Sequence, residues 1–372
     1  MTSTPPEARS ARPRSSWRIF APTAAFAVLV AVYSVYWYMA AGRMRATIEE
    51  FAASPAGNVA VAWNSLSISG YPYRFEASFA APSIRAPLAP EAWEWSAAGL
   101  EADFLPYNFR HVVLKIDGEQ VLKYRDVGGI APRHHIWHIA SRGSWASYVA
   151  IKDAPIGRIA IDIDDLVARH DGDGRADKLR IAADRLQLHA QPAEPDNGAS
   201  AAANRPELAN YDVALQGNDV TVGNAEASAV LGDRIALFGA QMRLKNLPRS
   251  VHASAVEISR QWLAEGGKLA VSDLAIKWGP LDLWAQGEVT LDAGMRPEGR
   301  FDAAIADYSK LIGALVKARV VSERDGRLAL VGMGLVAQLQ NDKSGRVHVP
   351  VIMKDGKLFL GPMMIARLEP LF

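Results

Sequence analysis

The hydrophobic pattern divides the chain into two parts. From residue 19 to residue 41 apolar residues run without one charged side chain, which is long enough for a helix to cross about 30 Å of hydrocarbon. Beyond residue 57 apolar and polar residues alternate instead, most regularly in Ile159-Ala160-Ile161-Asp162-Ile163. Alternation with period two predicts half-buried strands. The pattern therefore predicts a mainly β protein with a few helices: one N-terminal transmembrane helix followed by a long antiparallel sheet.

Composition shifts and turn signals set the expected boundaries. A stretch rich in Pro, Ala, Asn and Gly, residues 191–206, predicts a linker or long loop between two β-rich halves. Two segments have helical spacing, near 253–265 and near 306–319. The expected order is a cytoplasmic tail at 1–18, the anchor at 19–41, a helical stalk at 42–57, a first half at 58–190, the linker, and a second half at 207–372.

Asp-Gly pairs predict two hairpins, one turning at residues 117–120 and one at residues 354–357. Residues 66–75 and 274–283 also align without gaps, each with an alternating strand, a Gly/Pro turn and a second strand. Hairpins resemble one another by chance, so whether the two halves are related by duplication stays open.

Charge predicts the orientation of the anchor. Four arginines precede the apolar run, whereas Arg43 and Arg45 after it are followed by Glu49 and Glu50. The Lys/Arg bias places the N-terminus in the cytoplasm and the bulk across the membrane, in the periplasm of an inner-membrane protein. The alternative is a cleaved signal peptide, since Ala40-Ala41-Gly42 offers small residues. The run is longer than a signal core and is rich in aromatic residues at its end, at residues 33–38, which favours a retained signal anchor.

Composition excludes several classes of function. The 372 residues are 49% hydrophobic and 22% charged, as in folded proteins, and the net charge of +1 provides no basic field for nucleic acid. The chain contains no cysteine. Disulfides, thiol nucleophiles and Cys-ligated metals are therefore excluded.

Three segments carry residue types used in chemistry, and each has a simpler interpretation. The first segment contains His134, His135 and His138. A strand or a helix would place His134 and His138 on one face, but no carboxylate lies nearby in the sequence to complete a set of zinc ligands. The segment 171–177 alternates carboxylates but lacks the twelfth-position Glu of a calcium loop. Gly332-Met333-Gly334 lacks the third glycine of a dinucleotide fingerprint. We expect no catalytic residue, metal or cofactor, and hence a non-enzymatic protein.

Tryptophans are the remaining candidates. Trp93, Trp95 and Trp278 lie on predicted strands, and Trp93 and Trp95 share one face. Such rings serve core packing in most proteins, and in the alternative they line an apolar groove.

The motifs resemble an uncharacterised alphaproteobacterial family of anchored envelope proteins, a domain of unknown function. The likeness rests on Ser-Gly-Tyr-Pro-Tyr-Arg-Phe at 69–75, Trp-Gly-Pro-Leu-Asp-Leu at 278–283 and Asp-Gly-Lys-Leu-Phe-Leu-Gly-Pro at 355–362. The family has no established activity, so the resemblance assigns no catalytic residues to this chain. More loosely, an anchor before a long β domain is similar to AsmA-like envelope proteins, which implies a curved sheet with a lipid-handling groove.

These observations define three hypotheses. The first is a membrane protein that binds or handles lipid in the cell envelope, with the membrane and a lipid as its partners and no nucleic acid. The alternative is a structural or assembly factor that binds other envelope proteins through exposed strand edges. The third is an unrecognised hydrolase.

Overall fold

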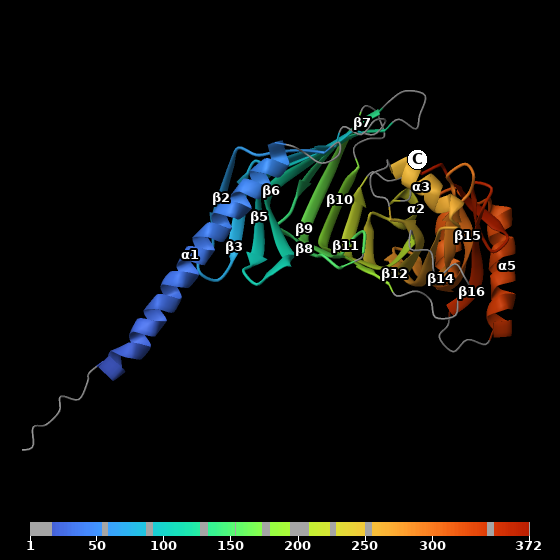
Figure 1. Cartoon of the computed structure of the whole chain (residues 1–372). Helices are drawn as coiled ribbons and strands as arrows, with labels where there is room; N and C mark the ends of the chain where they lie inside the picture. The colour runs from blue at the N-terminus through green and yellow to red at the C-terminus, as the bar shows by residue number, and fades with distance from the viewer. Residues whose placement is uncertain are drawn as a thin grey trace, which may run out of the picture.

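The computed structural model describes the chain except residues 1–16, 54–58, 87–91, 127–132, 153, 173–178, 194–207, 224–227, 250–254, 341–345 and 372. One antiparallel sheet of 18 strands forms most of the protein, and Figure 1 shows it as a curved wall with α1 at one end and α5 at the other. The sequence predicted this architecture, a mainly β protein with one apolar N-terminal helix.

Most strands follow the chain order across the sheet. From β9 to β18 each strand pairs with the next, while β7 and β8 lie end to end between β6 and β9. Near the start, β1 pairs with β4, and β3 and β4 both pair with β5. The first nine strands are β1 Ala60–Ala62, β2 Ser65–Ser69, β3 Phe75–Ala80, β4 Ser83–Ala86, β5 Trp93–Leu105, β6 Asn108–Asp126, β7 Arg133–Ala140, β8 Gly143–Val149 and β9 Arg158–Gly172. The others are β10 Arg180–Pro192, β11 Leu208–Gly223, β12 Arg234–Pro248, β13 Lys268–Trp278, β14 Leu281–Leu291, β15 Pro297–Ala306, β16 Arg346–Lys354, β17 Lys357–Leu360 and β18 Met363–Arg367.

The N-terminal helix is longer than the apolar run. The structure has a single helix α1, Trp17–Ala53, where the sequence suggested an anchor and a separate stalk. This helix is long and apolar enough to cross a membrane by length and composition. Its first half projects away from the sheet, and its second half lies against β2 and β3 (Figure 1).

The helices that follow are short, apart from the last. They are α2 Ser228–Leu231, α3 Ala255–Ala264, α4 Tyr308–Lys317 and α5 Glu323–Gln340. The segments near 253–265 and 306–319 were the helices expected from the sequence. Helix α5 was not expected, and it contains Gly332-Met333-Gly334, which lies in a helix rather than in a nucleotide-binding turn.

One predicted hairpin is wrong and the other is observed. The Asp117-Gly118 pair does not turn the chain, because β6 continues through it from Asn108 to Asp126. The register against β5 shifts there and Gly118 has a φ of +74°, so the pair forms a bulge. The hairpin between β16 and β17 does form, with both Asp355 and Gly356 at positive φ, as a two-residue type I′ turn requires.

The two expected halves share one sheet. Strand β10 includes Gln191 and Pro192 and pairs with β11 over most of its length. Of the expected linker, residues 194–206 lie outside the described residues. A duplication of the two halves stays a prediction.

Candidate functional site

One face of the sheet is apolar from end to end. The strand registers align the side chains in three rows, each running across thirteen strands on the same face. The central row is Ile68, Ala77, Ala102, Leu114, Ala146, Ile161, Leu188, Leu215, Ala240, Leu274, Ala285, Ala303 and Val349. No polar residue interrupts it.

Two further rows flank the central row. The edge row is Phe75, Phe104, Val112, Tyr148, Ile159, Ala190, Val213, Met242, Val271, Gly287, Phe301, Val351 and Leu360. The distal row is Leu66, Phe79, Leu100, Ile116, Ser144, Ile163, Leu186, Gly217, Phe238, Ile276, Leu283, Ile305 and Val347. We call the surface made by the three rows the apolar face.

Helices cover the apolar face at its two ends. At one end Trp37, Ala41 and Met44 of α1 pack against Phe75 and its neighbours. At the other end α4 and α5 pack on β14 to β17, where they bury side chains such as Ile305 and Val347. Each end therefore has the second layer that an amphipathic sheet needs for a closed core.

The middle of the apolar face has no such layer among the described residues. The apolar clusters there consist of strand residues alone, from β7 and β9 to β11 in one cluster and from β12 to β16 in the other. From β8 to β13 the face extends for about 24 Å, at roughly 4.8 Å per strand. A single-layer sheet that leaves large apolar side chains partly open to water has a surface that another apolar group can stabilise.

The apolar face ends in a cavity beside α5. This cavity has a volume of about 970 Å³, and most of its lining is apolar. It lies between α5 and the last strands and includes Val321, Leu328, Met333, Val349, Leu360 and Met363. Val349 is the last residue of the central row, so the cavity continues the apolar face to its end.

The opposite face of the sheet is polar and carries ion pairs across strands. Lys115 Nζ lies 3.3 Å from Glu101 Oε2, and Arg243 Nε lies 2.7 Å from Asp212 Oδ1. Arg185 Nε donates to Asp162 Oδ1 at 2.8 Å, and this hydrogen bond lowers the pKa of the Asp162 carboxyl. One face suits water and the other suits hydrocarbon, as expected of strands with period two.

Of the three predicted tryptophans, Trp278 lies far from Trp93 and Trp95. Trp93 and Trp95 are on β5, and Trp95 Nε1 donates to Gln120 Oε1 at 3.2 Å. Trp278 ends β13, pairs with Leu281, and donates to the carbonyl of Gly232. The seven strand spacings between β5 and β13 amount to about 34 Å. These rings therefore do not form one pocket.

An aromatic cluster next to Trp95 was not predicted. The ring of Tyr124 stacks on His135, and His135 stacks on His170, whose ring also contacts Trp137. His135 Nδ1 and His170 Nε2 are 2.9 Å apart, within hydrogen-bonding distance. Only the density of histidines around residue 135 signalled this cluster, because His170 comes from a strand 35 residues away.

The histidine segment does not assemble a metal site. His138 Nδ1 lies 3.1 Å from Glu119 Oε1, on the other side of the strand from His135. In the part of the chain that the structure describes, no group of three or more His, Asp or Glu side chains is placed to hold a metal ion. Of the segment 171–177, only Asp171 and Gly172 lie among the described residues, at the end of β9.

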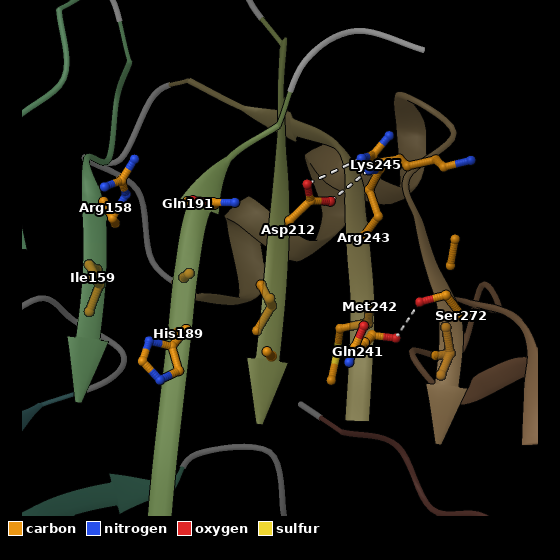
Figure 2. Close-up of a pocket in the computed structure, with 15 residues that line it drawn as sticks. Arg158, Ile159, His189, Gln191, Asp212, Gln241, Met242, Arg243, Lys245 and Ser272 are labelled. Atoms are coloured by element: carbon orange, nitrogen blue, oxygen red, sulfur yellow. Dashed lines mark hydrogen bonds and ion pairs between the residues drawn. The ribbon is translucent and has the colours of Figure 1, made fainter. Parts of the chain in front are cut away.

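A second pocket, of about 580 Å³, is lined by residues of β9 to β13, among them the polar-face side chains Asp212 and Arg243. Figure 2 shows its lining from β9 to β13, with Asp212 pointing toward Arg243 and Ser272 toward Gln241. The hydroxyl of Ser272 donates to the carbonyl of Gln241 at 3.2 Å. This serine is held by the backbone rather than by a general base, so the pocket lacks the geometry of a nucleophile.

One serine does contact a histidine. His111 Nε2 lies 2.9 Å from Ser147 Oγ on neighbouring strands. None of the cavities described above includes either residue. Among the contacts that the described residues show, no carboxylate orients His111, whereas a catalytic serine needs a base that is itself held in place.

The fold combines one N-terminal helix that is long and apolar enough to cross a membrane with one amphipathic sheet, whose apolar side is only partly covered among the described residues. The chain belongs to the DUF2125 family, described as uncharacterized proteins conserved in bacteria, and the family model matches residues 37–369. No curated protein and no solved structure matched the chain.

Proposed function

We propose that the protein is a non-enzymatic, inner-membrane-anchored protein of the bacterial periplasm that binds lipid acyl chains along its apolar face. The observation that carries this proposal is the unbroken central row across thirteen strands, combined with the lack of a second layer over β8 to β13 among the residues that the structure describes. The four arginines before α1 favour a cytoplasmic N-terminus and a periplasmic sheet.

An acyl chain matches the uncovered face in both chemistry and length. The open stretch of about 24 Å exceeds the roughly 15 Å that the chains of one leaflet span. Each methylene that leaves water contributes about 0.8 kcal/mol. A row of aliphatic side chains without hydrogen-bonding groups accepts chains of any headgroup, so the face selects for hydrocarbon rather than for a particular lipid.

The test is photocrosslinking in living cells from neighbouring positions on the two faces. A photoreactive residue at Leu215 or Leu188 projects from the apolar face, and the matched controls Gln216 and Gln187 project from the polar face of the same strands. We expect lipid adducts, read by mass spectrometry, from Leu215 and Leu188 only. Absence of lipid from both apolar positions would contradict the proposal.

A second candidate function, binding of other envelope proteins, is supported by α5. Four of its apolar side chains are exposed at helical spacing, namely Leu328, Val331, Leu335 and Leu339, with exposed fractions of 57% or more. Such a stripe fits a partner helix or groove. Crosslinks from Val331 to a defined protein, together with no lipid from Leu215, would favour this function over lipid binding.

A further inference from the structure

Exposed aromatic side chains gather at two turns beside α1. Tyr73 is 83% exposed in the turn between β2 and β3, and Tyr107 is 82% exposed in the turn between β5 and β6. Phe109, at the start of β6, is 51% exposed. Tyrosine and phenylalanine rings at the tips of turns are costly in water, and they are favoured at the headgroup level of a membrane.

Both turns are fixed to one short segment of α1. Ser34 Oγ lies 2.7 Å from the hydroxyl of Tyr71, and Tyr36 donates to the carbonyl of Pro106 at 3.2 Å. Trp37 Nε1 donates to the carbonyl of Arg74 at 3.2 Å. The two turns therefore lie at the height of residues 33–37 along the helix axis.

The length of α1 places that height at the membrane surface. Residues 17–36 extend for about 30 Å at 1.5 Å per residue, which equals the hydrocarbon thickness of a bilayer. If the hydrocarbon ended well before residue 33, the span would be too short. If it continued to residue 41, it would surround Arg74, Glu76 and Asp103, whose charges pair with one another beside the first turn.

Charge at the same edge of the sheet suits a phospholipid surface. Arg110 follows Phe109 and is exposed, and its carbonyl accepts from the N–H of Ala150 at 2.8 Å. That bond places the exposed Lys152 at the same edge. Cations beside interfacial aromatics attract the phosphates of an anionic membrane.

We propose that Tyr73, Tyr107 and Phe109 insert into the headgroup layer of the membrane that α1 crosses, so that the sheet stands on the bilayer by this edge. Helix α1 covers the edge row at Phe75, and beyond the helix the row continues along the same edge of the sheet through Tyr148 and Ile159. The apolar face thus opens at the leaflet surface, where acyl chains can enter it without crossing water. The inference rests on the proposed anchoring by α1, and it does not require that lipid be found on the middle of the sheet.

The test uses the absence of cysteine from the chain. Single variants Tyr73→Cys and Tyr107→Cys of the full chain carry an environment-sensitive fluorophore, in vesicles of phosphatidylethanolamine and phosphatidylglycerol. Arg142→Cys is the matched control, because Arg142 is exposed in the turn between β7 and β8, opposite the middle of β6 and about 35 Å from Tyr107 along that strand. Phe26→Cys, in the projecting part of α1, reports the anchor itself.

We expect blue-shifted emission at positions 73 and 107, quenched by lipids spin-labelled near the headgroup and shielded from aqueous iodide. Position 142 should respond only to iodide. Iodide quenching at 73 and 107 as strong as at 142 would overturn the inference. If position 26 is quenched by deep acyl labels while 73 and 107 are not, only the inference fails; if position 26 is not quenched, the proposed anchor fails and the inference with it.

Discussion

The indole of Trp37 stacks on the ring of Phe75, with 5.1 Å between the ring centroids and an interplanar angle of 19°. Both side chains are buried, at 3% and 0% exposure. The pair joins α1 to β3 of the sheet. Trp37 belongs to the aromatic group that the sequence suggested for the membrane interface. In the structure, however, its ring packs on protein, and its indole N–H donates to the backbone carbonyl of Arg74.

Trp37→Ala should separate α1 from the sheet. Removing a buried tryptophan costs about 3–5 kcal/mol, since the contact area is lost and a cavity remains. We expect a large fall in the thermal midpoint of the detergent-solubilised protein, and faster hydrogen exchange in β2 and β3. Phe26→Ala is the control, because Phe26 is 69% exposed on the same helix and should leave both measurements unchanged. Equal effects of the two substitutions would show that Trp37 does not hold the helix.

The β16–β17 turn provides a test of backbone conformation. Gly356 has a φ of +68°, so Gly356→Ala should destabilise the protein by about 1–2 kcal/mol. Gly239, in contrast, lies in β12 with ordinary φ and has no atom within 4 Å of an added Cβ. Gly239→Ala should be neutral or stabilising by up to about 1 kcal/mol. Chemical denaturation of both variants measures the difference, and a reversed order would contradict the type I′ turn.

Two carboxyl groups should respond to acid in opposite directions. The hydrogen bond from Arg185 lowers the folded-state pKa of Asp162 below the ordinary aspartate value of 3.8. The Arg185–Asp162 pair therefore stabilises the fold above about pH 3.8, and this stabilisation is lost as the pH falls through the lowered pKa of Asp162. Burial raises the pKa of Asp103 above 3.8, so protonation of Asp103 relieves a destabilising charge as the pH falls through the raised pKa.

Thermal midpoints measured between neutral and acid pH separate the two cases. Asp162→Asn should lower the midpoint at neutral pH and converge with the wild type in strong acid. Asp103→Asn should differ from the wild type mainly above the raised pKa, where the wild-type carboxylate is charged. Identical pH profiles for the two variants would contradict the assignment.

Features that depend on the local hydrophobic period could be predicted from the sequence, whereas features that depend on contacts between distant residues were missed. The apolar run of α1 and the alternation of β9 follow from residue order alone, so both were found. Asp117-Gly118 was misinterpreted because a glycine at positive φ serves a bulge as well as a hairpin turn. The register across the sheet, in contrast, is fixed by pairing between strands.

Helix α5 was missed for a related reason. It contains Gly326, Gly332 and Gly334, which lower helix propensity, and it is stabilised by packing on α4 and β16. The meeting of His135 with His170 also depends on pairing between strands, here between β7 and β9. No property of either segment alone indicates it.

Leu215→Asp separates lipid binding from general stability. Leu215 lies in the central row, where it faces the uncovered middle of the sheet. A carboxylate there must lose water when a chain binds, at a cost of several kcal/mol, so we expect more than about tenfold less co-purified lipid. Gln216→Asp adds the same charge one residue further, on the polar face, and should leave lipid unchanged. Lipid extracted from the purified variants and counted per protein by mass spectrometry makes the comparison. Equal lipid in the two variants would mean that hydrocarbon does not bind to the apolar face, and the exposed stripe on α5 would then be the better guide to what this protein binds.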